Sequence, residues 1–184
     1  MPEKEAAVSE TKAKAGIGPD HVQPLDPDTV VAELLDKDYI TRGVAIGGHI
    51  YTIKTFTGTE YSMFTRLYNY RLDSLTSTPR AVLVEHMRTE CMLPFILYAK
   101  DGEPVSPITE DLKKAWVVLD TTGECTYKDR VYKNQKDFFK ELYSTFYVEK
   151  ILTIPTVVTG IIAEEYNNLI KEVEKILKGD SLKN

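Results

Sequence analysis

The chain has 184 residues, a net charge of −5 and an apolar fraction of 42%. This length predicts one domain with or without tails, and the apolar fraction and 11 tyrosines exceed what disordered chains usually carry. An acidic balance is not the footprint of a protein that binds nucleic acid. We therefore expect a globular domain without a nucleic-acid partner.

The cysteines and the N-terminal segment bear on the compartment. Cys91 and Cys125 are the two cysteines, and nothing in their spacing requires a disulfide, so free thiols in a reducing compartment are expected. The first residues, MPEKEAAVSETKAKAG, lack the apolar core of a signal peptide. The longest apolar stretch, residues 151–163, is interrupted by Pro155 and is shorter than the ~20 residues that span a bilayer. These features predict a soluble intracellular protein without a membrane partner.

Three regions are predicted along the chain. Residues 1–27 are small and charged and are broken by Pro and Gly, which predicts a flexible or extended arm. A single domain is expected over residues 28–178, followed by a C-terminal tail over residues 179–184. The elements of this domain predict an α+β fold, mostly α, in which a small N-terminal β-hairpin packs on a helical bundle.

The domain is expected to begin with a short helix over residues 28–35. Asp26 or Asp28 can accept hydrogen bonds from the free amides of its first turn. The predicted buried face of this helix comprises Val31, Leu34 and Leu35.

A β-hairpin is predicted within VAIGGHIYTIKTFTGTEYSMF, residues 44–64. Its β-branched and aromatic runs, residues 44–46 and 50–53, are joined by Gly47 and Gly48. Two glycines suit a primed hairpin turn, because both can adopt positive φ without strain.

A helix is expected directly after the hairpin. Thr57 and Glu60 have the spacing of a capping box, in which each side chain binds the backbone amide of the other residue. Glycines and hydroxyls also surround phosphates, but a phosphate-binding loop of the Walker type needs a lysine that is missing here. We therefore interpret these residues as a turn and a cap. The face of the helix comprises Tyr61, Phe64, Tyr68, Leu72 and Leu75.

The middle of the chain alternates helical and extended patterns. A helix is expected over residues 78–93, ended by Pro94, because the residue before a proline disfavours helical geometry. A short strand and turn, or an extended connector, follows over residues 95–105. Another helix is predicted over residues 106–119, and a polar loop or small hairpin over residues 120–134.

The C-terminal third carries the clearest helical periodicity. A helix over residues 135–152 is rich in aromatic residues, and residues 156–178 form a longer helix with apolar residues three or four positions apart. We expect this seam to make one contact within the chain, in part with the two aromatic helices, and one with another protein. The seam comprises Val158, Ile162, Tyr166, Leu169, Val173 and Ile176.

Candidate reactive residues occur in VEHMRTEC. His86 and Glu90 lie one helical turn apart, but two ligands fall short of the three or four that zinc takes. Cys91 as a nucleophile needs a base within reach, and on a helix His86 points about 140° away from it. We therefore expect no metal, no cofactor and no catalytic residue, and we interpret Cys91 as a core residue.

A glycine hairpin followed by an aromatic helix is similar to the opening of bacteriophage tail-assembly chaperones and the related baseplate-hub assembly proteins. That opening pairs a G-x-x-Y strand with L-T-x-x-E. Gly48, Tyr51, Thr57 and Glu60 match it, and Phe56 stands where a leucine is more usual.

The closing segment VVTGIIAEEYNNLIKEVEKIL also resembles the C-terminal amphipathic helix of that group. The resemblance covers residues 44–75 and 138–178. It implies a non-enzymatic protein that binds phage tail or baseplate proteins, or copies of itself, through helical faces. The implied location is the host cytoplasm or the virion.

Several alternatives stay open at this point. The resemblance fits a transient chaperone and a permanent virion subunit equally. Two other functions are a small cysteine-dependent enzyme built on Cys91 and a host-directed protein-binding module.

Overall fold

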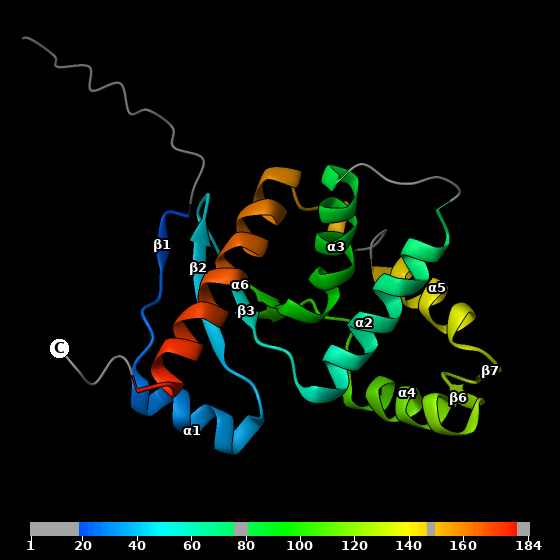
Figure 1. Ribbon diagram of the computed structural model, residues 1–184. Coiled ribbons are helices and arrows are strands. Elements are labelled where there is room, and N and C mark those ends of the chain that lie inside the picture. The colour runs from blue at the N-terminus through cyan, green and yellow to red at the C-terminus, as the bar shows by residue number, and fades with distance from the viewer. Residues whose placement is uncertain (1–18, 76–80, 147–149, 180–184) are drawn as a thin grey trace, which may run out of the picture.

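Helices predominate in the computed structural model, which describes residues 19–75, 81–146 and 150–179, and they pack beside a small antiparallel sheet (Figure 1). The α+β, mostly α fold class is therefore confirmed. The helices are α1 (Pro27–Lys37), α2 (Gly58–Asp73), α3 (Ala81–Ile96), α4 (Glu110–Thr122), α5 (Gln135–Phe146) and α6 (Thr156–Leu177).

The sheet is larger than the predicted hairpin. Its strands follow the order β1-β2-β3-β4-β5, and every neighbouring pair is antiparallel. The predicted hairpin is its centre, while β4 and β5 come from the middle of the chain, because α3 returns the backbone to the free edge of β3. The strands are β1 (His21–Val22), β2 (Thr41–Ile46), β3 (His49–Lys54), β4 (Leu97–Lys100) and β5 (Glu103–Pro104).

The turn between β2 and β3 has the predicted geometry. Gly47 and Gly48 have φ angles of +59° and +78°, the left-handed region in which a side chain is strained. The two-residue turn fixes the register that pairs Val44 with Tyr51. The two glycines therefore form the hairpin turn, as predicted.

The fold extends N-terminally of Asp28, where the sequence placed the start of the domain. His21 and Val22 pair with β2, and the Asp20 carboxylate accepts a 2.7 Å hydrogen bond from the amide of Gly47. This pairing gives the outer edge of β2 backbone partners, which an exposed edge strand lacks. The rest of the predicted arm, residues 1–18, lies outside the described residues.

Helix α1 buries a different face from the predicted one. Asp26 is the N-cap, and its carboxylate accepts a 2.9 Å hydrogen bond from the amide of Thr29. Val30 is fully buried, whereas Val31 and Leu35 of the predicted buried face are exposed. Adjacent stripes of this short helix are both apolar, so the packing partner decided which one is buried.

Helix α3 continues past its predicted end. Pro94 lies inside the helix, and its missing N–H costs one backbone hydrogen bond in the final turn. The carbonyl of Pro94 accepts a 2.8 Å hydrogen bond from the Ser106 hydroxyl, and β4 begins immediately after Ile96. The prediction that Pro94 ends the helix is therefore wrong, since α3 runs three residues past the predicted last residue, 93.

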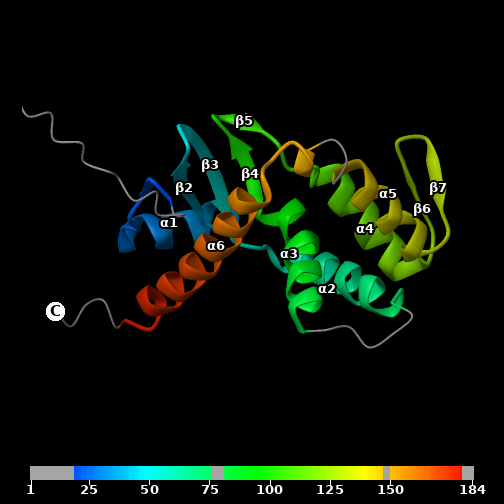
Figure 2. The ribbon, with the colours of Figure 1, turned by 90° about the horizontal axis from the view of Figure 1, so that it is seen from above.

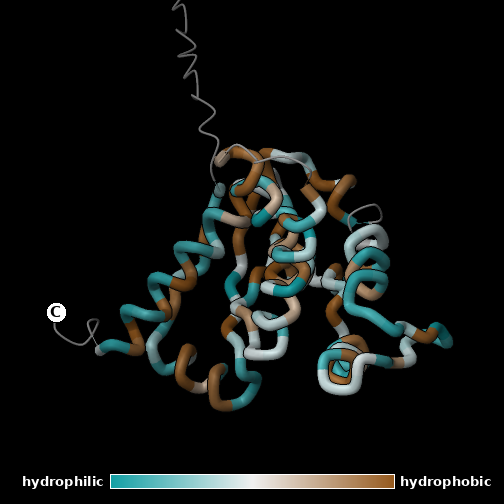
Figure 3. The backbone as a smooth tube through the Cα atoms, turned by 45° about the vertical axis from the view of Figure 1, so that its right-hand side comes forward, coloured by the Kyte–Doolittle hydropathy of each residue, from teal (hydrophilic) through white to brown (hydrophobic). Residues whose placement is uncertain are grey.

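Helix α6 packs against one face of the sheet. It contacts β2, β3 and α3, so the covering surface is chiefly the sheet rather than the aromatic helices that we expected (Figure 2). Apolar positions alternate with hydrophilic ones along it, as its amphipathic sequence requires (Figure 3). The buried Arg42 of β2 also forms an ion pair with Glu172.

The predicted seam on α6 is internal. Ile162 and Leu169 are completely buried, Tyr166 and Val173 nearly so, and Val158 and Ile176 are half-buried. A second protein cannot contact side chains that the same chain already covers. The buried residues of the seam therefore make the predicted internal contact, and a partner surface has to be sought among side chains that stay accessible.

The remaining elements form the other side of the molecule. Helix α4 carries the fully buried Trp116, whose ring centroid lies 4.9 Å from that of Phe139 on α5. The loop between these helices is a hairpin of β6 (Cys125–Tyr127) and β7 (Arg130–Tyr132), one of the two predicted forms. In the described part of the chain, no helix has the length and apolarity needed to cross a membrane.

Replacement of Leu169 by Asp should destabilise the fold. The variant places a carboxylate in a fully buried site without a partner, at a cost of several kcal/mol. Urea denaturation measures the loss. Leu177→Asp on the same helix is the matched control, because Leu177 is 57% exposed and should cost less than about 1 kcal/mol. Equal stability of the two variants would contradict this packing of α6.

Candidate functional site

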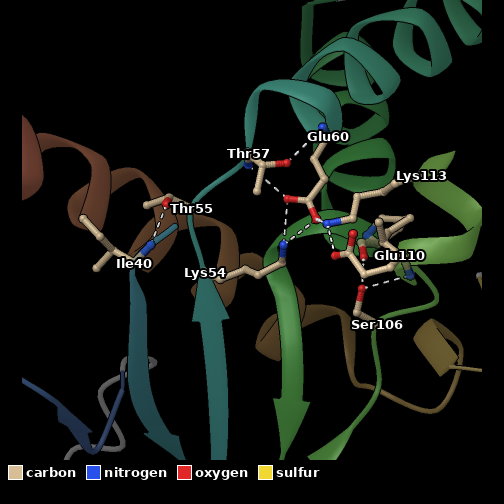
Figure 4. Close-up of polar contacts among 10 residues, drawn as sticks. Ile40, Lys54, Thr55, Thr57, Glu60, Ser106, Glu110 and Lys113 are labelled. Carbon is tan, nitrogen blue, oxygen red and sulfur yellow. Dashed lines mark hydrogen bonds and ion pairs between the residues drawn. The ribbon is translucent and has the colours of Figure 1, made fainter. Parts of the chain in front are cut away.

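A buried ion pair joins the end of β3 to the start of α2. The Lys54 ammonium lies 2.6 and 2.7 Å from the two carboxylate oxygens of Glu60, and the side chains are 4% and 1% exposed. Lys113 of α4 approaches the same carboxylate at 3.7 Å and also contacts Glu110 at 2.5 Å (Figure 4). One carboxylate therefore links the sheet, α2 and α4.

The surroundings of Lys54 shift the pKa of its ammonium group in opposing directions. Burial lowers the pKa of Lys54 below its usual value, and the hydrogen bonds and charge of Glu60 oppose that shift. The ring of Tyr39 lies 4.7 Å from the ammonium and supplies a further electrostatic contact. Such a pair is strongly destabilising when one partner is removed, because the other charge stays buried.

The connector between β3 and α2, residues 55–57, is held by hydrogen bonds at both ends. The backbone amide of Thr55 donates to the Ile40 carbonyl, and the amide of Ile40 donates to the Thr55 hydroxyl, each at 2.9 Å. The Thr57 hydroxyl accepts from the Glu60 amide at 3.3 Å, and the Glu60 carboxylate accepts from the Thr57 amide at 3.0 Å. The predicted capping box is therefore confirmed. Phe56 lies between the two anchors.

Phe56 is the centre of an aromatic cluster. Its ring stacks on Phe64 with centroids 5.3 Å apart, and Phe64 stacks in turn on Tyr68 at 6.0 Å. Tyr61 and Tyr166 meet Phe56 edge to face at 6.0 and 5.5 Å. These geometries are the favourable ones for aromatic pairs, so the cluster is well packed.

A groove of about 960 Å³ lies over this cluster. Its walls come from α2 and α6 and its floor includes residues of α3, which lies between them (Figures 1 and 2). Phe64 and Met92 in the lining are buried, whereas Tyr61 is 59% exposed and Ile170 is half-buried. The groove thus has a packed apolar floor and an open aromatic rim.

The charge of the groove is opposite to that of the chain. Arg88 and Lys171 line it, and none of the described lining residues is acidic, although acidic residues outnumber basic ones 28 to 23 in the whole chain. Arg88 is close enough to Tyr166 for its charge to act on that hydroxyl. Burial nevertheless raises the pKa of Tyr166, which stays neutral.

A second polar cluster surrounds Glu90 of α3. The Tyr143 hydroxyl donates to its carboxylate at 2.9 Å, His86 lies 3.1 Å away and Arg71 lies 3.8 Å away. Arg71 also stacks on the ring of Tyr143 at 4.4 Å. Burial and the Glu90 carboxylate raise the pKa of Tyr143, so its hydroxyl remains a hydrogen-bond donor. The cluster joins α2, α3 and α5 to one another.

Cys91 lies in an environment that suppresses thiol chemistry. It is completely buried, and desolvation raises the pKa of its thiol to about 12. A nucleophilic thiol requires a low pKa and access to solvent, and Cys91 has neither. Neighbouring His86 is more than half exposed and is paired with Glu90. In the part of the chain that the structure describes, no three His, Cys, Asp or Glu side chains gather into a possible metal site.

The groove contains some residues that the sequence singled out and others that it did not. Tyr61, Phe64 and Tyr68 share a face of α2, as their spacing predicted. Arg88 and Lys171 were not predicted, because they come from helices that meet only in the tertiary structure and neither lies in a local motif. Of the predicted cap residues, Thr57 is itself among the residues that line the groove.

Comparison of the chain with protein-family models, with curated proteins and with solved structures found no match.

Replacement of Glu60 by Gln should destabilise the protein by about 3–5 kcal/mol, because the Lys54 ammonium is then buried without its carboxylate. Lys54→Met should cost less, since Glu60 keeps Lys113 and the amide of Thr57 as partners. The double variant should therefore be more stable than Glu60→Gln alone. Urea unfolding of the wild type and the three variants gives the interaction energy of the pair as a double-mutant cycle.

The exposed pair of Glu174 and Lys178 provides the control. Glu174→Gln should cost no more than about 1 kcal/mol, because both side chains are more than half exposed. If Glu60→Gln behaved like Glu174→Gln, the ion pair would not anchor the fold.

The thiol of Cys91 should affect stability in alkaline solution. Its pKa is about 12 in the folded protein against an ordinary 9.0, so its contribution is complete below pH 9.0 and is lost as the pH rises toward about 12. The stability advantage of the wild type over Cys91→Ala should therefore narrow above pH 9.0, as measured by urea unfolding at successive pH values. Cys125 is present in both proteins, so its contribution to the pH dependence cancels in the difference. An advantage that stays constant would show that Cys91 ionises normally.

Proposed function

We propose that this protein is a non-enzymatic assembly factor or structural subunit of a phage tail or baseplate, and that it binds another tail component through the groove between α2, α3 and α6. The observation that carries the proposal is the groove itself, an aromatic surface with a firm floor and an open rim. Tyrosine and arginine are the residues that most often dominate binding between proteins. Both occur on this rim.

The position of the groove agrees with the resemblance to tail-assembly proteins. One similar segment, residues 44–75, supplies the connector with Phe56 and the wall with Tyr61 and Tyr68. The other similar segment, residues 138–178, supplies the opposite wall with Tyr166, Asn167, Ile170 and Lys171. Both similar segments therefore contribute to one surface.

A catalytic role is less well supported than binding. The cysteine hypothesis depends on a thiolate at Cys91, and burial of this thiol disfavours that species. The Glu90 carboxylate already accepts from Tyr143 and pairs with His86. A binding protein needs neither a nucleophile nor a base, and it would act in the host cytoplasm or remain in the virion.

Replacement of Tyr61 by Ala should reduce capture of a tail or baseplate protein about tenfold or more, because an exposed ring at the rim of the groove is lost. Tagged wild type and variant are expressed during infection, and captured proteins are identified and quantified by mass spectrometry. Tyr98→Ala is the matched control, since Tyr98 is a partly exposed tyrosine on β4 outside the groove.

Thermal midpoints of both variants verify that the fold is intact. Tail or baseplate proteins captured equally by Tyr61→Ala and the wild type would exclude the groove as their binding surface. Capture of host proteins alone would instead identify a host-directed module.

A further inference from the structure

We propose that the groove receives an amphipathic helix of the partner protein whose apolar stripe is flanked by carboxylates. This inference rests on the proposed function and specifies the chemistry of its partner. Three observations carry it: the arrangement of the three helices, the composition of the groove floor, and the sign of the charge on its rim.

The arrangement of the helices suits a helical occupant. Helix α3 contacts both α2 and α6 and lies between them in two perpendicular views (Figures 1 and 2). The groove is lined by residues of all three helices, and a helix laid in such a groove buries one apolar face along its length. The lining residues of α2 run from Gly58 to Asn69, which is about three turns of helix, while α3 contributes Arg88 and Met92.

The composition of the floor requires apolar side chains from the occupant. Phe56, Phe64 and Met92 are exposed only slightly or partly, and Ile170 closes the side formed by α6. These groups offer no hydrogen bond to a polar ligand. Binding energy at the floor therefore comes from burial of apolar surface, about 25 cal/mol per Å².

The charges at the rim require carboxylates from the occupant. Arg88 has a side chain that is 44% exposed, and its contact with the more exposed Glu85 is long, at 3.9 Å. Lys171 on the other side is exposed and makes no ion pair with the residues that the structure describes. Arg88 of α3 and Lys171 of α6 thus both line the space that a bound helix would occupy. Arginine recognises a carboxylate through two parallel hydrogen bonds.

Single-stranded nucleic acid fits this groove less well than a protein helix. Bases bind by stacking on exposed ring faces. The rings of Phe56, Phe64 and Tyr68 instead stack on one another, with interplanar angles of 19° and 13°. Two cations also provide a weak attraction for a polyanion when the chain carries a net charge of −5.

The test uses three synthetic peptides of 16 residues, the length of α2 and α3, that share one leucine and phenylalanine stripe. Their flanking positions carry glutamate, glutamine or lysine. Fluorescence anisotropy of labelled peptide measures each dissociation constant for the full-length protein. We expect the glutamate peptide to bind about tenfold or more tightly than the lysine peptide, with the glutamine peptide between them.

A charge-reversed protein tests the residues. Arg88→Glu combined with Lys171→Glu should invert this order of affinities, because both cations become carboxylates. The matched control is Lys140→Glu combined with Lys175→Glu, which produces the same change in net charge at exposed positions outside the groove. The control should keep the wild-type order, which separates a local effect from the overall charge.

The outcomes distinguish this inference from the proposed function. Equal binding of the three peptides, or an order that survives reversal at Arg88 and Lys171, would overturn the acidic partner and leave a protein-binding groove. Failure of every peptide to bind would overturn the helical occupant, and an oligothymidylate that bound instead would identify a nucleic-acid groove. The proposed function itself fails only in the infection experiment with Tyr61→Ala.

Discussion

The ion pair between Lys54 and Glu60 is the interaction on which the rest of the structure depends. It is made where β3 ends and α2 begins, so it fixes the angle between the sheet and the helices. The same Glu60 carboxylate caps α2 through Thr57 and approaches Lys113 of α4. Charges so deeply buried are favourable only while all partners are present, which makes this junction specific to one arrangement.

The junction explains why the aromatic groove has a defined shape. Phe56 lies between Thr55, bound to Ile40, and Thr57, bound to Glu60. Its backbone is therefore held by contacts within the chain, and the rings packed around it restrict the side chain. For the binding role that we propose, a preorganised floor lowers the entropy lost on binding.

Buried polar groups and exposed polar groups have different tasks in this protein. Glu90, Arg71 and Tyr143 bind one another and join helices, and Arg42 with Glu172 joins α6 to the sheet. Arg88 and Lys171 lie instead at a rim where a carboxylate can reach them. Titratable residues near one another thus do not by themselves indicate catalysis, and those around Glu90 hold three helices together.

Local chemistry by itself predicted the hairpin turn, the capping box and the presence of the helices, although not every helix end. Gly47 and Gly48 suffice for a primed turn, and Thr57 with Glu60 suffices for a capping box, because each motif acts over a few neighbouring residues. Only the tertiary structure decided what the seam of α6 covers and which face of α1 is buried, since amphipathic periodicity identifies an apolar face without its partner. The groove was likewise decided only by the tertiary structure. Its walls are separated by about a hundred residues of chain and meet only when α3 packs between them.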